Sequence, residues 1–105
     1  MHTNVKVEKK LSTLIEDMAP FDSSYEDVII SGINTNSEKI SPGDLFIAIK
    51  GKKYDGHNFI KDAEGKGASA IIANNIKNSG SNKPQVIVQN TRKAVSTVSS
   101  RFYDN

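Results

Sequence analysis

The sequence lacks cysteine altogether and contains two histidines, His2 and His57. Without a thiol, the chain can form neither a disulfide nor a cysteine nucleophile, and it cannot ligate zinc through sulfur. The two histidines do not form a cluster, so we expect no transition-metal site in this chain. Thiol catalysis and sulfur-ligated zinc are therefore excluded as classes of function.

Long apolar runs are also missing. No stretch approaches the roughly 20 apolar residues that span a bilayer. Residues 1–10 include basic side chains, but the apolar core of a signal peptide does not follow them. We therefore expect a cytoplasmic protein with no membrane partner.

The sequence has little excess charge of either sign, because 14 Lys and Arg against 12 Asp and Glu give a net charge of +2. A nucleic-acid-binding module would need its lysines on one face. Lys50, Lys52, Lys53 and Tyr54 are the candidates for such a face, but aromatic residues are few and the glycine-aromatic signature of RNA-binding sheets is absent. Nucleic acid is therefore an unfavoured partner. Strongly salt-dependent binding to mixed RNA would favour this alternative instead.

The apolar pattern predicts a single α/β domain over residues 1–105, which is enough chain for one core. Residues 45–49 form a continuous apolar run, typical of a central strand that is buried on both faces. Strands that alternate with helices favour a small mixed or partly parallel sheet flanked by helices. The other expected elements are a helix from Val7 to Met18 that ends before Pro20, a strand or bulged pair at 28–33, a helix around 59–63, strands within 68–73 and 85–88, a polar loop at 74–84, and a last helix capped by Thr91.

The most informative segment is 41–60, SPGDLFIAIKGKKYDGHNFI. Pro42 and Gly43 fit the central positions of a type II turn, an apolar strand follows, and the polar loop 50–56 leads into a helix. Ligands of open α/β sheets bind at the carboxyl ends of strands, where such loops lie. Residues 34–38, NTNSE, are polar and suit a turn or a strand end. Both segments are therefore candidate binding edges.

Motifs in and around these segments carry a family resemblance. The chain has PGDLF at 42–46, DG at 55–56, FI at 59–60, GA at 67–68, Arg92, and RFY at 101–103. Together with TNSE at 35–38, they resemble the amino-terminal domain of the MurE-type Mur ligases, and the resemblance covers nearly the whole chain. Asn36 and Glu38 stand where the family has an aspartate and an arginine, so the charge pair around the motif serine is lost.

The resemblance implies a Mur ligase amino-terminal fold and a division of labour between domains. In this family the amino-terminal domain holds the UDP end of UDP-MurNAc-L-Ala-D-Glu during peptidoglycan synthesis, a central domain binds ATP and magnesium, and a carboxyl-terminal domain recruits diaminopimelate or lysine. The chain has no GxxGK[ST] loop for ATP phosphates. We therefore expect no catalytic residue and no cofactor in this chain, no ligation by it alone, and the remaining domains as partners in a complete ligase.

Carried over by position, the substrate contacts fall at Thr35, Ser37, Lys52, Lys53 and Tyr54. Hydroxyl and backbone groups of Thr35 and Ser37 can match the carbonyls and N–H of uracil, the lysines suit a diphosphate, and Tyr54 can stack on the base. A simpler interpretation makes the lysines solvated and Ser37 a turn residue. Because the charge pair is lost, an alternative also stays open, in which the domain binds no ligand and is either a truncated remnant or an interaction domain.

Several other residues have ordinary structural interpretations. We expect Asp44 and Asp55 to set turns or cap helices, because aspartate beside glycine commonly does so. His57 is expected at the surface or in a cap, since no second histidine, cysteine or paired carboxylate supports acid-base work. The remaining assignments are Phe46 and Phe102 in the core, and Arg92 and Arg101 as helix-surface charges, with Arg92 alternatively turned toward an anion.

Overall fold

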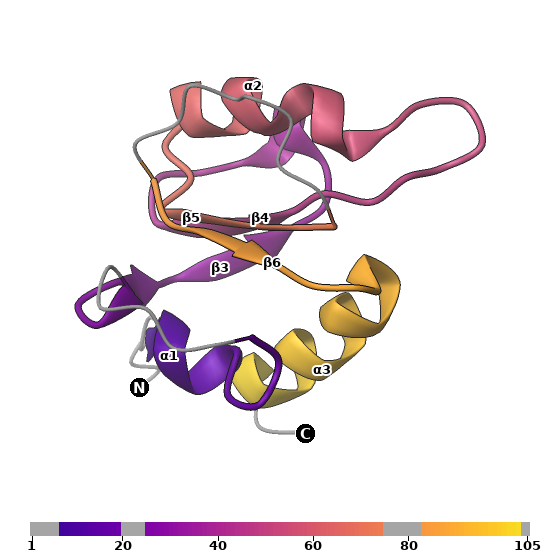
Figure 1. The fold of residues 1–105 in the computed structure, drawn as a ribbon. Helices are drawn as coiled ribbons and strands as arrows, with labels where there is room; N and C mark the ends of the chain where they lie inside the picture. The colour runs from indigo at the N-terminus through magenta and orange to yellow at the C-terminus, as the bar shows by residue number, and fades with distance from the viewer. Residues whose placement is uncertain (1–6, 20–24, 75–82, 104–105) are drawn as a thin grey trace, which may run out of the picture.

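The computed structural model describes residues 7–19, 25–74 and 83–103, and its centre is a parallel sheet of four strands in the order β3-β4-β5-β6 (Figure 1). The strands are β3 (Gly32–Asn34), β4 (Asp44–Ile47), β5 (Ala70–Ala73) and β6 (Gln85–Ile87). Strand β4 is interior, as its apolar run predicted, and Phe46 in β4 pairs with Ile71 in β5. The prediction of an α/β fold with a partly parallel sheet is confirmed.

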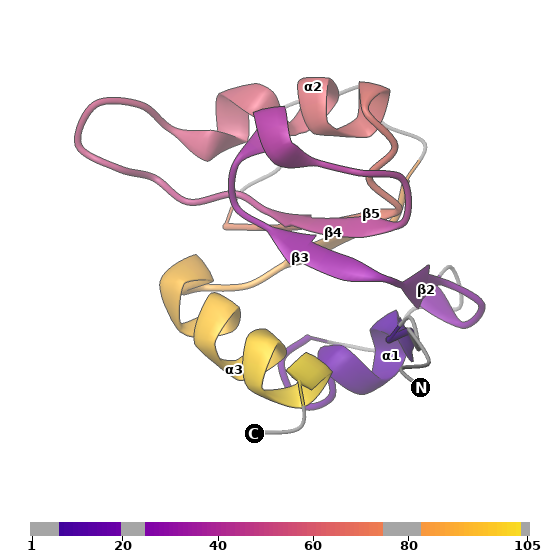
Figure 2. The ribbon, with the colours of Figure 1, turned by 180° about the vertical axis from the view of Figure 1, so that it is seen from behind.

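Helices cover both faces of this sheet, with α2 on one face and α1 and α3 on the other (Figure 2). Their bounds are α1 (Leu11–Leu14), α2 (Ile60–Gly65) and α3 (Thr91–Tyr103). Because successive strand residues point to opposite faces, Phe46 joins the core with Ile60, whereas Leu45 and Ile47 join the core with Phe102. The assignment of both phenylalanines to the core is confirmed. In the part of the chain that the structure describes, every helix is too short or too polar to cross a membrane.

The amino-terminal helix is shorter than predicted. Instead of a helix from Val7 to Met18, the chain forms an extended β1 (Lys9–Lys10) and then the single turn α1. Lys10 is extended, with φ −70° and ψ 137°, and the Leu11 N–H donates to the Val28 carbonyl at 2.9 Å. This cross-strand pairing competes with helix formation. The prediction was right that Leu11, Leu14 and Ile15 are buried, but wrong about the length of the helix and about Val7, which is exposed. Pro20 lies outside the described residues.

Arg101 is not the surface charge that the sequence suggested. From the last turn of α3, its Nη1 donates to the carbonyl oxygens of Leu14 at 3.1 Å and Glu16 at 2.6 Å. The last carbonyls of a helix have no partner within the helix, so a guanidinium can supply the missing donors. Arg101 therefore holds the end of α1 against α3.

Short local motifs place the strands of the central sheet. Residues 28–33 divide between β2 (Ile29–Ile30), which pairs with β1, and β3. The Asp44 N–H donates to the Ser41 carbonyl at 3.0 Å, and Gly43 has φ 93°, so the predicted type II turn is confirmed. The Asp44 carboxylate accepts from the Ser41 N–H at 2.9 Å, which confirms its role as a turn residue. Most of the predicted loop 74–84 lies outside the described residues.

Candidate functional site

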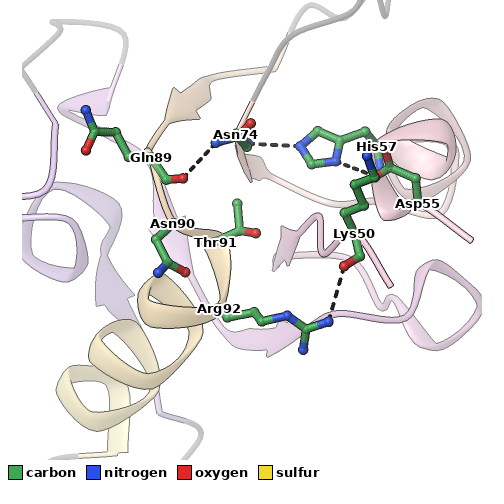
Figure 3. A pocket seen from close by; sticks show the side chains of 8 residues that line it. All are labelled: Lys50, Asp55, His57, Asn74, Gln89, Asn90, Thr91 and Arg92. Atoms are coloured by element: carbon green, nitrogen blue, oxygen red, sulfur yellow. Dashed lines mark hydrogen bonds and ion pairs between the residues drawn. The ribbon is translucent and has the colours of Figure 1, made fainter. Parts of the chain in front are cut away.

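Three neighbouring cavities follow the carboxyl ends of the parallel strands. The β3-side cavity, of about 400 Å³, is lined by Thr35, Asn36, Ser37, Glu38, Phe46, Tyr54, Gly56 and Phe59. The middle cavity, of about 380 Å³, is lined by Thr35, Ile49, Gly51, Tyr54, Arg92 and Val95. The β6-side cavity, of about 380 Å³, is lined by Lys50, Asp55, His57, Asn74, Gln89, Asn90, Thr91 and Arg92 (Figure 3). Because adjacent cavities share residues, we call the three together the carboxyl-edge trough.

The turn after β3 is built by asparagine side chains. Asn34 Oδ1 accepts from the Asn36 N–H at 3.1 Å, and Asn36 Oδ1 accepts from the Glu38 N–H at 2.9 Å, which caps the short helix η2 (Ser37–Lys39). Such local side-chain bonds are why asparagine favours turns. The predicted turn is confirmed, and Asn36 supplies the cap without a charge pair.

Ser37 lines the β3-side cavity but is buried, with only 6% of its surface exposed. The Lys66 ammonium, at 3.1 Å, and then the hydrogen bond from the Ser37 hydroxyl lower the pKa of Asp62 on α2. The hydroxyl is therefore already engaged within the protein. Ser37 ties η2 to α2, and a ligand that needed the hydroxyl proton would have to displace that bond, whereas a ligand N–H could still donate to the hydroxyl oxygen.

Tyr54 and Thr35 line the same two cavities, which places two of the sequence candidates together. Tyr54 is 59% exposed as a residue, and its ring meets Phe59 edge to face, with 5.6 Å between the ring centroids. An exposed ring at a cavity wall, braced by a second ring, is suited to stacking on a flat ligand. Lys52 and Lys53 are exposed at the tip of the loop after β4, and neither lines any of the three cavities.

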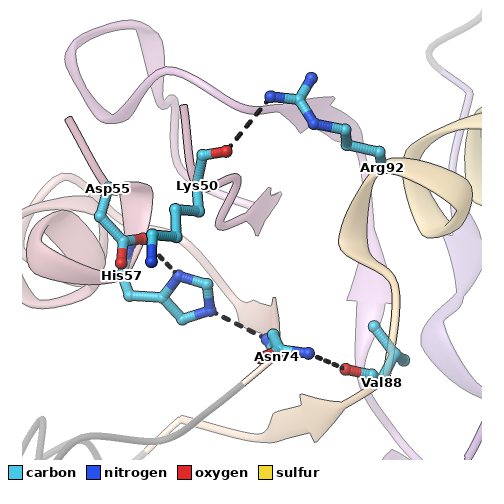
Figure 4. Close-up of polar contacts among 6 residues, drawn as sticks. All are labelled: Lys50, Asp55, His57, Asn74, Val88 and Arg92. Atoms are coloured by element: carbon cyan, nitrogen blue, oxygen red, sulfur yellow. Dashed lines mark hydrogen bonds and ion pairs between the residues drawn. The ribbon is translucent and has the colours of Figure 1, made fainter. Parts of the chain in front are cut away.

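His57 bridges two segments that are distant in sequence (Figure 4). Its Nδ1 lies 2.6 Å from the Asp55 carboxylate, and its Nε2 accepts from the Asn74 N–H at 2.9 Å. A backbone N–H can only donate, so the ring proton sits on Nδ1 and points at Asp55. The expectation of a surface or capping histidine without a carboxylate partner was wrong: the side chain is 9% exposed and joins the loop after β4 to the end of β5.

Asp55 caps η3 (Gly56–Phe59), as predicted. Its carboxylate accepts from the His57 N–H at 3.0 Å, and this bond is the main reason why the pKa of Asp55 is lowered. Burial, the second-largest cause, opposes this by raising the pKa, and the contact with the His57 ring lowers it further. Asn74 continues the chain of contacts, because its Nδ2 donates to the Val88 and Gln89 carbonyls at 3.2 and 2.7 Å.

Arg92 lines both the middle and the β6-side cavities, and its Nη2 donates to the Lys50 carbonyl at 3.2 Å (Figures 3 and 4). Helix α3 is capped by Asn90, whose Oδ1 accepts from the Lys93 N–H at 3.0 Å, and not by Thr91 as predicted. Thr91 is the first residue of the helix instead. Arg92 in the first turn consequently reaches over the trough, which agrees with the alternative orientation toward an anion.

The sequence reasoning did not include Asn74 in a site, and it named Lys50 within the candidate edge 50–56 but not among the substrate contacts. Each follows closely on a strand, β4 or β5, so the rule that pointed to residues 34–38 was a usable signal for both. Among residues 7–19, 25–74 and 83–103, His, Asp and Glu side chains do not gather in groups of three or more that could hold a metal ion.

The fold and trough define a small parallel α/β domain with its cavities at the carboxyl edge of the sheet. Residues 29–103 match the family model described as Mur ligase family, catalytic domain, and the chain belongs to this family. The predicted resemblance to the Mur ligases is thereby confirmed.

Individual relatives agree with this membership. The UDP-N-acetylmuramoyl-L-alanyl-D-glutamate–2,6-diaminopimelate ligase of Aquifex aeolicus is 42% identical over 74 residues, which are 70% of this chain and 15% of that ligase. MurF from Acinetobacter baumannii has a TM-score of 0.77 at 23% identity, over 92% of this chain and 21% of its own, and supports the fold. MurF ligase from Thermotoga maritima in complex with ADP has a TM-score of 0.57 at 36% identity, over 63% of this chain and 15% of its own. The chain thus spans only a small part of the relatives it matches.

Proposed function

We propose that this chain binds the UDP end of UDP-MurNAc-L-Ala-D-Glu, as the substrate-binding domain of a MurE-type ligase. The observation that carries the proposal is the meeting of Thr35 and Tyr54 at two shared cavities of the carboxyl-edge trough. These residues come from the two segments that resemble the family's substrate loops. The similarity to a ligase named for UDP-N-acetylmuramoyl-L-alanyl-D-glutamate supports the same substrate.

The trough can contact uracil both by stacking on its ring and by hydrogen bonding to its polar edge. Tyr54 supplies an exposed ring for stacking, and the Thr35 hydroxyl can donate to or accept from the base. Ser37 contributes by holding η2 against α2, since its hydroxyl is bound to Asp62. Lys52 and Lys53, at the loop tip, remain available to a substrate that extends past the trough.

The chemistry of ligation belongs to the complete ligase in this proposal. The chain lacks a GxxGK[ST] loop to cradle ATP phosphates, and its residues hold substrate without activating it. ATP and magnesium are proposed for the other domains, and the ADP complex of the Thermotoga maritima relative supports nucleotide use elsewhere in the family. Residues 1–105 then form one domain whose partners are the rest of the ligase and the UDP-linked substrate.

Calorimetric titration with UDP and with uridine tests the proposal. We expect measurable binding of both, and Tyr54→Ala should weaken it by roughly 1–3 kcal/mol, the range for loss of one stacked base. Tyr54→Phe should retain most of the affinity, because the ring remains. Tyr103→Ala is the matched control, since Tyr103 is also exposed but lies at the end of α3, outside the cavities. Absence of binding, or equal affinity in Tyr54→Ala and the native chain, would overturn the proposal.

A further inference from the structure

Charge is distributed unevenly along the carboxyl-edge trough. Glu38 is the charged residue that lines the β3-side cavity, and no lysine or arginine lines it. Arg92 lines the middle cavity, and Lys50 and Arg92 both line the β6-side cavity. The trough therefore runs from an acidic end beside β3 to a basic end beside β6.

The carboxylate at the basic end is already engaged. Asp55 lines the β6-side cavity, but it accepts hydrogen bonds from both the backbone and the ring of His57. Lys50 also attracts it, as the least of the causes that lower the pKa of Asp55. Asp55 thus does not pair with Arg92, and within the described residues no ion pair links Arg92 to a carboxylate.

Arg92 is fixed in position while most of its donors stay available. A guanidinium carries several N–H donors in a planar fork that suits two oxygens of one phosphate. In the described part of the chain it makes one hydrogen bond, from Nη2 to the Lys50 carbonyl. That bond draws the group over the trough and leaves the rest of the fork to a ligand (Figure 4).

We infer that Arg92 and Lys50 form the anion subsite of the trough, which takes the diphosphate of a nucleoside diphosphate whose base lies in the β3-side cavity. The inference rests on the proposed function and adds the direction of the ligand to it. A diphosphate placed beside Glu38 would meet a like charge, whereas the other end offers two cations. The inference therefore assigns the diphosphate contacts to Arg92 and Lys50 at the wall of the trough, and not to Lys52 and Lys53 as the sequence suggested.

The test compares three ligands, UDP, uridine and inorganic pyrophosphate, in calorimetric titrations at fixed ionic strength. Arg92→Gln should weaken UDP and pyrophosphate binding by roughly tenfold to a hundredfold and uridine binding by less than about twofold, since only the phosphates lose a charged partner. Arg92→Lys should restore part of the loss. Lys50→Gln should act in the same direction more weakly, and it leaves the Arg92 bond intact because that bond uses the Lys50 backbone.

Two charge-matched variants locate the effect. Lys93→Gln removes a neighbouring exposed charge on α3 that lines none of the trough cavities, so UDP binding should not change. Lys52→Gln with Lys53→Gln should weaken UDP binding less than Arg92→Gln does. Thermal melting of every variant shows whether it is folded. If Arg92→Gln does not fold, the effect of Lys50→Gln on UDP binding tests the anion subsite.

The outcomes distinguish failure of one proposal from failure of both. If uridine fails to bind but pyrophosphate binds through Arg92, the uridine site is wrong and the anion subsite stands. If Arg92→Gln and Lys50→Gln leave UDP binding unchanged, or weaken UDP and uridine equally, the anion subsite is overturned while the uridine site survives. If the native chain binds neither UDP nor pyrophosphate, both proposals fail.

Discussion

His57 shows how one side chain can link the segments that surround this site. Its ring spans Asp55 and the Asn74 N–H, which lie two and 17 residues away in sequence. Asn74 then reaches the Val88 and Gln89 carbonyls after β6, so the carboxyl ends of neighbouring strands are cross-linked at the β6-side cavity. Sequence spacing could reveal Asp55 but not Asn74, because their proximity depends on the pairing of the strands.

We expect His57→Ala to lower the free energy of unfolding by about 1–3 kcal/mol, since it leaves the Asn74 N–H and the Asp55 carboxylate without their ring partner. Urea unfolding measures the change. Asn58→Ala, at the exposed neighbouring position, is the control and should change stability by less than about 0.5 kcal/mol. Equal stability of His57→Ala and the native chain would show that the bridge contributes nothing.

Helix α1 shows that an element can depend on its neighbour more than on its own sequence. A helix of four residues is far too short to persist alone, because helix nucleation is unfavourable. Burial of Leu11 and Leu14 and two hydrogen bonds from Arg101 hold it against α3. Lys9 adds a bond from Nζ to the Arg101 carbonyl at 2.7 Å. The apolar spacing predicted the burial of Leu11 and Leu14 correctly, while the tertiary contacts decided where the helix begins and ends.

Arg101→Ala should therefore destabilise the protein by about 1–3 kcal/mol, the range for losing hydrogen bonds from a charged donor. Amide exchange should accelerate first in residues 11–18, before the central sheet opens, because this segment loses its anchor. Lys93→Ala, an exposed substitution on the same helix, is the control. Protection of residues 11–18 that equals that of the native chain would contradict the assigned role of Arg101.

At the scale of the whole molecule, apolar runs predicted the sheet better than the site. The run at 45–49 identified β4 because a strand covered on both faces must be apolar throughout. Thr35, Ser37 and Tyr54 were found through family motifs, and they do line one cavity. Lys50, which lines the β6-side cavity, was not expected there, because tertiary contacts decide which lysine of an exposed loop faces a cavity. The Arg92 bond to the Lys50 carbonyl is such a contact.

Amide chemical shifts of isotope-labelled protein, recorded during titration with UDP-MurNAc-L-Ala-D-Glu, test the central claim most directly. The account predicts saturable shifts at residues 35–38, 50–57 and 91–93, which surround the carboxyl-edge trough, and little change at Leu11 and Leu14 in the opposite core. Arg92→Gln should reduce the shifts at 91–93 more than those at 35–38. Saturating ligand that moves no amide of the trough, or moves only amides outside it, would contradict the claim that this edge of the sheet binds the UDP end of the substrate.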